Sequence, residues 1–131
     1  MQKLLIKGKR ELSGTISISG SKNASLPILA ACILSSNVKL SNVPFVKDIF
    51  TMLDLLKYIG MKITIKKKKG SIELKNKINN QNNLAPYKLV KTMRAGVLVL
   101  GSLLTKYKKA KVSLPGGCAI GTRPVDLHLF A

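Results

Sequence analysis

Residues 114–128 read Leu-Pro-Gly-Gly-Cys-Ala-Ile-Gly-Thr-Arg-Pro-Val-Asp-Leu-His, a stretch rich in glycine that also holds a cysteine and an arginine. Glycines allow tight turns and let backbone amides approach a ligand closely. Cys118 lies between glycines rather than in an apolar run, so its thiol is predicted to reach solvent and to react. Arg123 adds a permanent cation suited to phosphate or carboxylate. The stretch predicts a reactive thiol beside an anion site; the alternatives are a plain surface turn and a buried cysteine.

The same stretch, with Ser113 before it, resembles the active-site loop of the enolpyruvyl transferase family, in the branch whose acceptor is UDP-N-acetylglucosamine. Two upstream segments resemble that family in the same order: residues 20–27 (GSKNASLP) and residues 85–95 (APYKLVKTMRA). The resemblance implies transfer of an enolpyruvyl group from phosphoenolpyruvate to the 3-hydroxyl of UDP-N-acetylglucosamine, the first committed step of peptidoglycan synthesis. It implies no metal and no cofactor. The sister enzymes of aromatic amino-acid synthesis share the fold and the donor but lack the cysteine loop.

The resemblance also implies roles for single residues. Cys118 would be the catalytic residue, acting as an acid toward phosphoenolpyruvate or forming a covalent adduct with it, and would be the target of fosfomycin. Lys22 would contact phosphoenolpyruvate, and Asn23 would hydrogen-bond the reacting substrate. Arg94 would help to hold the anionic substrates, and Arg123 would pair with the transferred phosphate. The nucleotide end would be cradled by Pro124, Val125, Asp126 and Leu127.

Hydrophobic periodicity predicts an α/β fold. The expected elements are strands at residues 4–6 and 15–19, a helix at 24–34 capped by Asn23, a strand at 38–40, a helix at 46–59 ended by Gly60, a hairpin from 61 to 74 with a lysine-rich tip, a long helix at 87–104, and a strand at 111–114. The pattern begins to repeat after residue 83. The resemblance implies inside-out α/β repeats of the enolpyruvyl transferase type, incomplete here, with helices inside and sheets outside.

The members of the resembled family are several times longer than 131 residues and have two domains. We therefore expect residues 1–21 to be the opening strands of an otherwise missing second domain, and residues 22–131 to be a truncated catalytic domain. The missing C-terminal part would supply the acidic residue whose carboxylate accepts the proton of the acceptor hydroxyl. The chain alone is therefore expected to be inactive. The alternatives are a partner-dependent half, or a non-catalytic remnant that binds polyanions without specificity.

The net charge of +18 invites that polyanion reading, but the chain has only three arginines and no tryptophan. No basic stretch is interleaved with stacking residues, so neither specific nucleic-acid binding nor membrane binding is expected. Its two cysteines and one histidine lack the spacing of a metal site. The apolar runs fall short of the roughly 20 residues needed to span a bilayer. These features favour a cytoplasmic protein.

Two basic clusters have both a functional and a structural interpretation. Lys22 and Asn23 at a predicted helix start suit a small anion site, although an ordinary capped turn explains them as well. Lys88, Lys91 and Arg94 recur at three-residue steps near the start of the predicted long helix, where they repel one another and oppose the helix dipole. That spacing suggests a nearby anion; an exposed basic face is the alternative. Cys32, inside an apolar run, is predicted to be a core residue.

Overall fold

A three-stranded antiparallel sheet forms one layer of the structure, a computed structural model that describes residues 3–9, 11–76, 84–91, 93–114, 125–126 and 130. Its strands are β1 (Asn37–Leu40), β2 (Met61–Lys66) and β3 (Ser71–Asn76), in the order β1-β3-β2. The predicted hairpin is confirmed, with Ile63 opposite Leu74 and Ile65 opposite Ile72. A short 3-10 helix, η2 (Lys67–Lys69), forms its lysine-rich tip. Alternation along the hairpin thus sends apolar side chains to one face.

Helix α2 (Lys47–Ile59) packs on that apolar face and carries the centre of the core. The predicted helix at 46–59 is confirmed, and its apolar residues at steps of three and four positions are all fully buried: Ile49, Met52, Leu53, Leu56 and Ile59. Leu55 is buried as well, and α1, α3 and β4 also pack against α2. Gly60 ends the helix with φ of 111°, a left-handed conformation that glycine adopts without strain. The sheet covers α2 on one side, and the opposite face of the sheet stays exposed.

Helix α1 (Lys22–Ala31) lies beside α2 and continues into a 3-10 helix, η1 (Cys32–Leu34). The predicted cap is wrong by two positions. Ser21, not Asn23, is the N-cap: its backbone is extended, and its Oγ accepts a hydrogen bond from the Ala24 amide at 3.3 Å. The helix therefore begins with Lys22 as its first residue. Cys32 is 4% exposed, so its predicted place in the core is confirmed.

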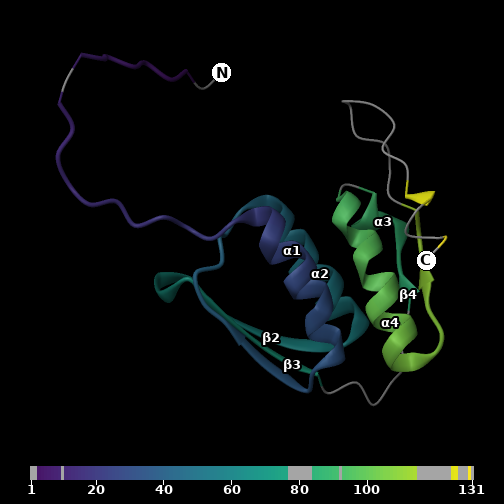
Figure 1. The fold of residues 1–131 in the computed structure, drawn as a ribbon. Coiled ribbons are helices and arrows are strands. Elements are labelled where there is room, and N and C mark those ends of the chain that lie inside the picture. The colour runs from purple at the N-terminus through teal and green to yellow at the C-terminus, as the bar shows by residue number, and fades with distance from the viewer. Residues whose placement is uncertain are drawn as a thin grey trace.

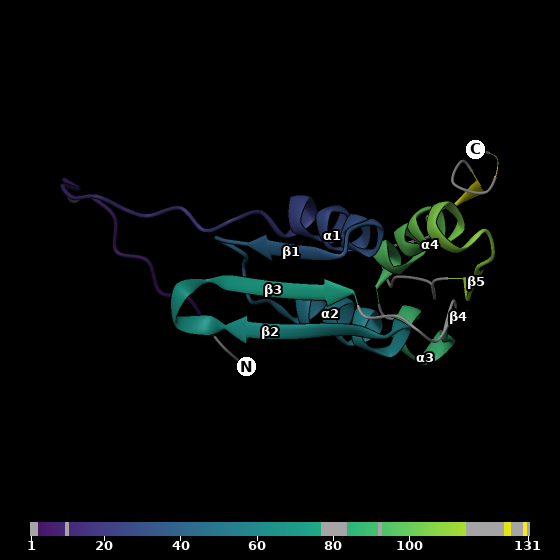
Figure 2. The ribbon, with the colours of Figure 1, turned by 90° about the horizontal axis from the view of Figure 1, so that it is seen from below.

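A second group of elements lies at the end of the α1–α2 layer away from the hairpin tip (Figures 1 and 2). It comprises β4 (Leu84–Ala85), α3 (Tyr87–Val90), η3 (Arg94–Leu98), α4 (Val99–Tyr107) and β5 (Lys111–Val112). Strands β4 and β5 pair in parallel, and β5 is shorter than the predicted strand at 111–114. The Ile33 carbonyl ties the two groups together: it accepts from Asn76 Nδ2 at 2.8 Å and from Lys106 Nζ at 2.5 Å.

The predicted continuous helix at 87–104 is wrong, because the chain breaks between α3 and η3. Met93 adopts an extended backbone, with φ of −139° and ψ of 105°, and its side chain is buried. The turn brings Gly96 against Val90 so closely that a Cβ on Gly96 would lie 3.1 Å from Val90 Cγ1. A straight helix would spread this apolar run around its whole circumference. The break instead lets Val90, Met93 and Leu103 join one core.

The two strands predicted at residues 4–6 and 15–19 are also not formed. Residues 3–9 and 11–20 run away from the packed body as an extended segment (Figure 1), and Ile16 and Ile18 are 89% and 86% exposed. No described strand lies beside them, and an isolated strand cannot satisfy its backbone groups except with water. The segment joins the body at Gly20, whose amide donates to Asn42 Oδ1 at 3.1 Å.

Candidate substrate site

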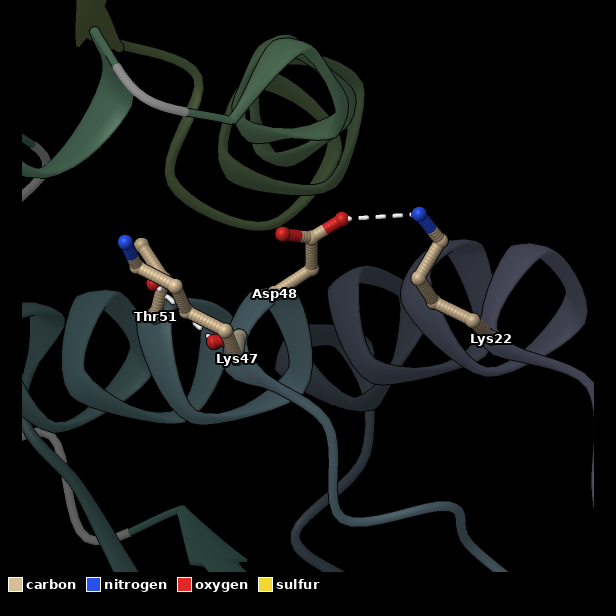
Figure 3. Close-up of polar contacts among 4 residues, drawn as sticks. All are labelled: Lys22, Lys47, Asp48 and Thr51. Carbon is tan, nitrogen blue, oxygen red and sulfur yellow. Dashed lines mark hydrogen bonds and ion pairs between the residues drawn. The ribbon is translucent and has the colours of Figure 1, made fainter. Parts of the chain in front are cut away.

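Lys22 and Asp48 form an ion pair between the first turns of α1 and α2 (Figure 3). Lys22 Nζ lies 2.9 Å from Asp48 Oδ2, and the two side chains are 47% and 36% exposed. Because Ser21 caps α1, the Lys22 ammonium group extends from the very start of the helix. The free amides at a helix start already favour anions, and an exposed ammonium group adds to that preference. The pair therefore lies at a helix start that solutes can reach.

The start of α2 is held in shape by its own backbone and side chains. Thr51 Oγ1 donates a hydrogen bond to the Lys47 carbonyl at 3.1 Å (Figure 3). Lys47 points its amino group away from Asp48, so it does not share the carboxylate with Lys22. Asp48 is the acidic residue of the first turn of α2, where a negative charge stabilises the helix dipole. Asp48 thus stabilises the start of α2 and also pairs with Lys22 of α1.

Asn23 and Arg94 are both exposed, one as the second residue of α1 and the other as the first residue of η3. Element η3 packs against α1, so two of the three matching segments meet in the fold. Lys88, Lys91 and Arg94 do not lie on one continuous helix as expected, because the break separates Arg94 from α3. Lys91 instead places its Nζ 6.0 Å from the ring centre of Tyr87.

Most of the predicted loop residues lie outside the described residues, namely Cys118, Arg123, Pro124 and Leu127. Val125 and Asp126 are described, the first half-buried and the second exposed. The approach to the loop is also described: β5 pairs with β4, and the Ser113 amide donates to the Ala85 carbonyl at 3.0 Å. The second matching segment, which begins at Ala85, is therefore bonded to the strand that leads into the cysteine loop.

Cys32 provides the contrast expected for a structural thiol. It is buried in the core, and its Sγ donates to the Ile28 carbonyl at 3.2 Å. Burial removes water from around the thiol and raises its pKa, because the charged thiolate is disfavoured in an apolar setting. Burial therefore disfavours the reactive thiolate form of Cys32. If the chain has a reactive cysteine, it is the other one.

Among the described residues, no three histidine, cysteine, aspartate or glutamate side chains gather closely enough to hold a metal ion. None of the helices in the described part of the chain combines the length and the apolar character needed to cross a bilayer.

Sequence reasoning missed two residues of this region, Ser21 and Asp48. Ser and Asn are about equally good N-cap residues, so the local sequence favours Ser21 as much as Asn23. Asp48 lies outside the apolar positions of α2, so sequence spacing alone predicts only a solvated side chain there. It is one of only five acidic residues beside 23 basic ones, which is a hint that its position matters.

Comparison with known proteins gives consistent results. Residues 6–131 match the family described as EPSP synthase (3-phosphoshikimate 1-carboxyvinyltransferase). The chain is 60% identical to UDP-N-acetylglucosamine 1-carboxyvinyltransferase of Pelagibacter ubique, with 100% of this chain and 31% of that protein aligned. It is 56% identical to the protein of the same name from Cellvibrio japonicus, over 98% of this chain and 30% of that protein. The chain thus spans about 30% of the length of these relatives.

A solved structure adds evidence on the fold. The enolpyruvyl transferase NikO from Streptomyces tendae superposes with a TM-score of 0.63 at 19% sequence identity. The superposition covers 72% of this chain and 22% of that one, so the described fold is a part of the enolpyruvyl transferase architecture, as expected from the sequence. From its sequence match over residues 6–131, this chain belongs to the EPSP synthase family.

Proposed function

We propose that the chain supplies the first part of an enzyme that transfers enolpyruvyl from phosphoenolpyruvate to the 3-hydroxyl of UDP-N-acetylglucosamine. The observation that carries the proposal is the 55–60% identity to relatives of that name along nearly the whole of this chain. The exposed Lys22 ammonium group at the start of α1 supports it, because the donor substrate is an anion. The proposal includes a role in peptidoglycan synthesis and a cytoplasmic location.

In the proposed reaction, the acceptor hydroxyl oxygen bonds to C2 of phosphoenolpyruvate while C3 gains a proton. The tetrahedral intermediate then loses phosphate and a proton, which leaves the enolpyruvyl ether. Lys22 and Arg94 would neutralise the anionic groups, and Arg123 would pair with the departing phosphate. Cys118 would donate the proton to C3 or form a covalent adduct with the donor. Asn23 would hydrogen-bond the reacting substrate.

We assign nucleotide binding to residues 124–127. Pro124, Val125, Asp126 and Leu127 would hold the nucleotide, partly through backbone groups. Residues 1–21 would contribute strands to a second domain, and residues 22–131 would form part of the substrate domain. The group that accepts the hydroxyl proton would come from the part of the enzyme that the relatives have and this sequence lacks, so the chain alone would be inactive.

A chimera tests the proposal directly. Residues 1–131 would replace the matching part of the Pelagibacter ubique relative, which is 60% identical. We expect the chimera to release phosphate from phosphoenolpyruvate only when UDP-N-acetylglucosamine is present, and the isolated chain to release none. Cys118→Ala should lower the rate at least about 100-fold, the usual contribution of a positioned acid. Cys32→Ala is the matched control and should keep the rate. An inactive chimera beside an active parent enzyme would contradict the proposal.

Alkylation of the isolated chain tests the Cys118 assignment separately. Fosfomycin or iodoacetamide should label Cys118 first, because burial both shields Cys32 and raises its pKa. Peptide mapping after partial labelling measures the ratio of the two. Equal labelling would mean that residue 118 has no special reactivity in this chain.

A second candidate function is non-specific binding of polyanions, and one structural observation favours it. The outer face of the sheet exposes Lys39, Lys62 and Lys75, and Lys62 lies directly opposite Lys75. Like charges paired across strands are destabilising, so an anion there would relieve repulsion. Binding of this kind should ignore DNA sequence and weaken steeply with salt. Fluorescence anisotropy with unrelated duplexes at rising salt measures both properties; binding that persists at high salt would require another explanation.

A further inference from the structure

The Lys22–Asp48 ion pair is placed where it contributes little to stability. Both side chains are more than a third exposed, and water and salt screen such pairs. The pair nevertheless brings together residues 26 positions apart, from two helices that pack side by side. Asp48 is also the only acidic residue in the first turn of α2, while α1 has none in its own. Helix α1 thus depends on its neighbour for a countercharge to Lys22.

Lys22 needs that countercharge because its position is electrostatically unfavourable. As the first residue of α1, it adds a positive charge to the positive end of the helix dipole. With only five acidic residues in the chain, few carboxylates are available to balance it. A lysine without a partner would sample many rotamers in water, whereas Asp48 holds the ammonium group between the two helices (Figure 3).

We propose that Asp48 is a positioning residue, which holds the Lys22 ammonium group while no anion is bound and yields it to an incoming phosphate. The inference rests on the proposed function, in which Lys22 contacts the donor substrate. A carboxylate and a phosphate seek the same three N–H donors, so they compete for Lys22, and their like charges repel each other. The partial exposure of the pair allows this exchange, since water solvates Asp48 after its partner leaves.

The test titrates inorganic phosphate into the full chain and follows the lysine side-chain signals by NMR with 13C-labelled lysine, Lys22 being assigned with Lys22→Arg. Asp48→Asn should bind phosphate about threefold more tightly than the wild type, a change of the size expected for an exposed pair. Asp48→Glu keeps the charge and should return the affinity toward the wild-type value. Amide spectra of the same samples verify that each variant is folded.

Asp54→Asn is the matched control. Asp54 lies on the same helix and pairs with Lys57 at 3.2 Å, so this variant removes the same charge without touching Lys22. Its phosphate affinity should stay at the wild-type value. Equal affinities in Asp48→Asn and the wild type would overturn the inference, as would equal tightening in Asp48→Asn and Asp54→Asn.

Failure of the inference can be told apart from failure of the proposed function. If phosphate leaves the Lys22 signals of the wild type unchanged, Lys22 is not an anion contact, and the inference is overturned together with that assignment. If Lys22 responds but the Asp48 variants behave like the wild type, only the inference is overturned. The activity of the chimera, measured without any change at Asp48, reports on the proposed function by itself.

Discussion

The β2–β3 hairpin and the segment of residues 3–20 carry the same sequence pattern and adopt opposite structures. Ile63 and Ile65 alternate with polar residues in the hairpin, just as Ile16 and Ile18 do in the segment. The first two pack against the core, while the second two are 89% and 86% exposed. Alternation therefore specifies which face a strand would bury, and a partner decides whether the strand forms.

The hairpin brings its own partner within the next few residues. Strand β3 supplies the hydrogen bonds, and α2 covers the apolar face that the two strands create. The segment has neither among the described residues, although residues 4–6 and 15–19 within it favour strands. In the proposed two-domain enzyme, its partner strands would lie in the part of the relatives that this chain does not match. Four pairs of substitutions and one exchange measurement can break or sharpen this comparison.

The largest expected effect separates the packed core from the exposed segment. Leu53→Ala removes a fully buried side chain from α2 and should lower the free energy of unfolding by about 2–5 kcal/mol. Ile16→Ala, in the segment, should change it by no more than about 0.5 kcal/mol. Urea unfolding followed by circular dichroism measures both. A comparable loss in the two variants would show that the segment is packed in solution.

The next effect lies at the junction between the two regions. A Cβ on Gly20 would lie 1.9 Å from the Asn42 carbonyl oxygen, so Gly20→Ala must displace backbone. It should cost about 1–3 kcal/mol, as overpacking usually does. Gly8→Ala is the control, because a Cβ there meets nothing within 4 Å. Thermal unfolding of both variants should show a shift for Gly20→Ala only; a shift for neither would mean that the junction is loose.

A smaller effect tests where the packed region begins. Ser21→Ala removes the hydrogen bond to the Ala24 amide and should destabilise the chain by about 1 kcal/mol. Asn23→Ala should cost less, because Asn23 lies inside the first turn and is not the cap. The same urea experiment ranks the two. The reverse order would restore the cap predicted from the sequence.

The smallest effect concerns pH. Lys66 hydrogen-bonds Glu73 at 3.1 Å and, with further help from Lys39 and Lys75, lowers the pKa of the Glu73 carboxyl group. A carboxyl pKa that falls on folding stabilises the protein above the unfolded-state pKa, and this stability is lost as pH falls through the folded-state value. Glu73→Gln should therefore be slightly less stable than the wild type at pH 7 and equal to it in strong acid. Glu11→Gln, in the exposed segment, should show no such difference.

Much of the fold could be predicted because its signals are local. The hairpin, α2 and its closing glycine depend on alternation, helical spacing and one left-handed residue, all visible within a short window. The break at Met93 could not be predicted, since it depends on the packing of Gly96 against Val90 and on what surrounds a run of apolar residues. A helix was the better local choice, and tertiary packing overrode it.

The candidate site likewise has one feature that local sequence predicts and one that depends on tertiary packing. Lys22 was expected at the start of a helix, and it is there. Its contact with Asp48 could not be predicted, because the packing of two helices 26 positions apart sets it. The roles of Cys118 and Arg123 remain predictions based on the resemblance, since both residues lie outside the described part of the chain.

Hydrogen exchange tests most directly the central claim, that the segment of residues 3–20 lacks only its partners. Amide exchange would be measured for residues 15–19 in the isolated chain and in the chimera with the Pelagibacter ubique relative, using β3 as the internal reference. We predict that these amides exchange freely in the isolated chain and become protected in the chimera, while β3 is protected in both. Protection of residues 15–19 in the isolated chain, or its absence in the chimera, would contradict the account.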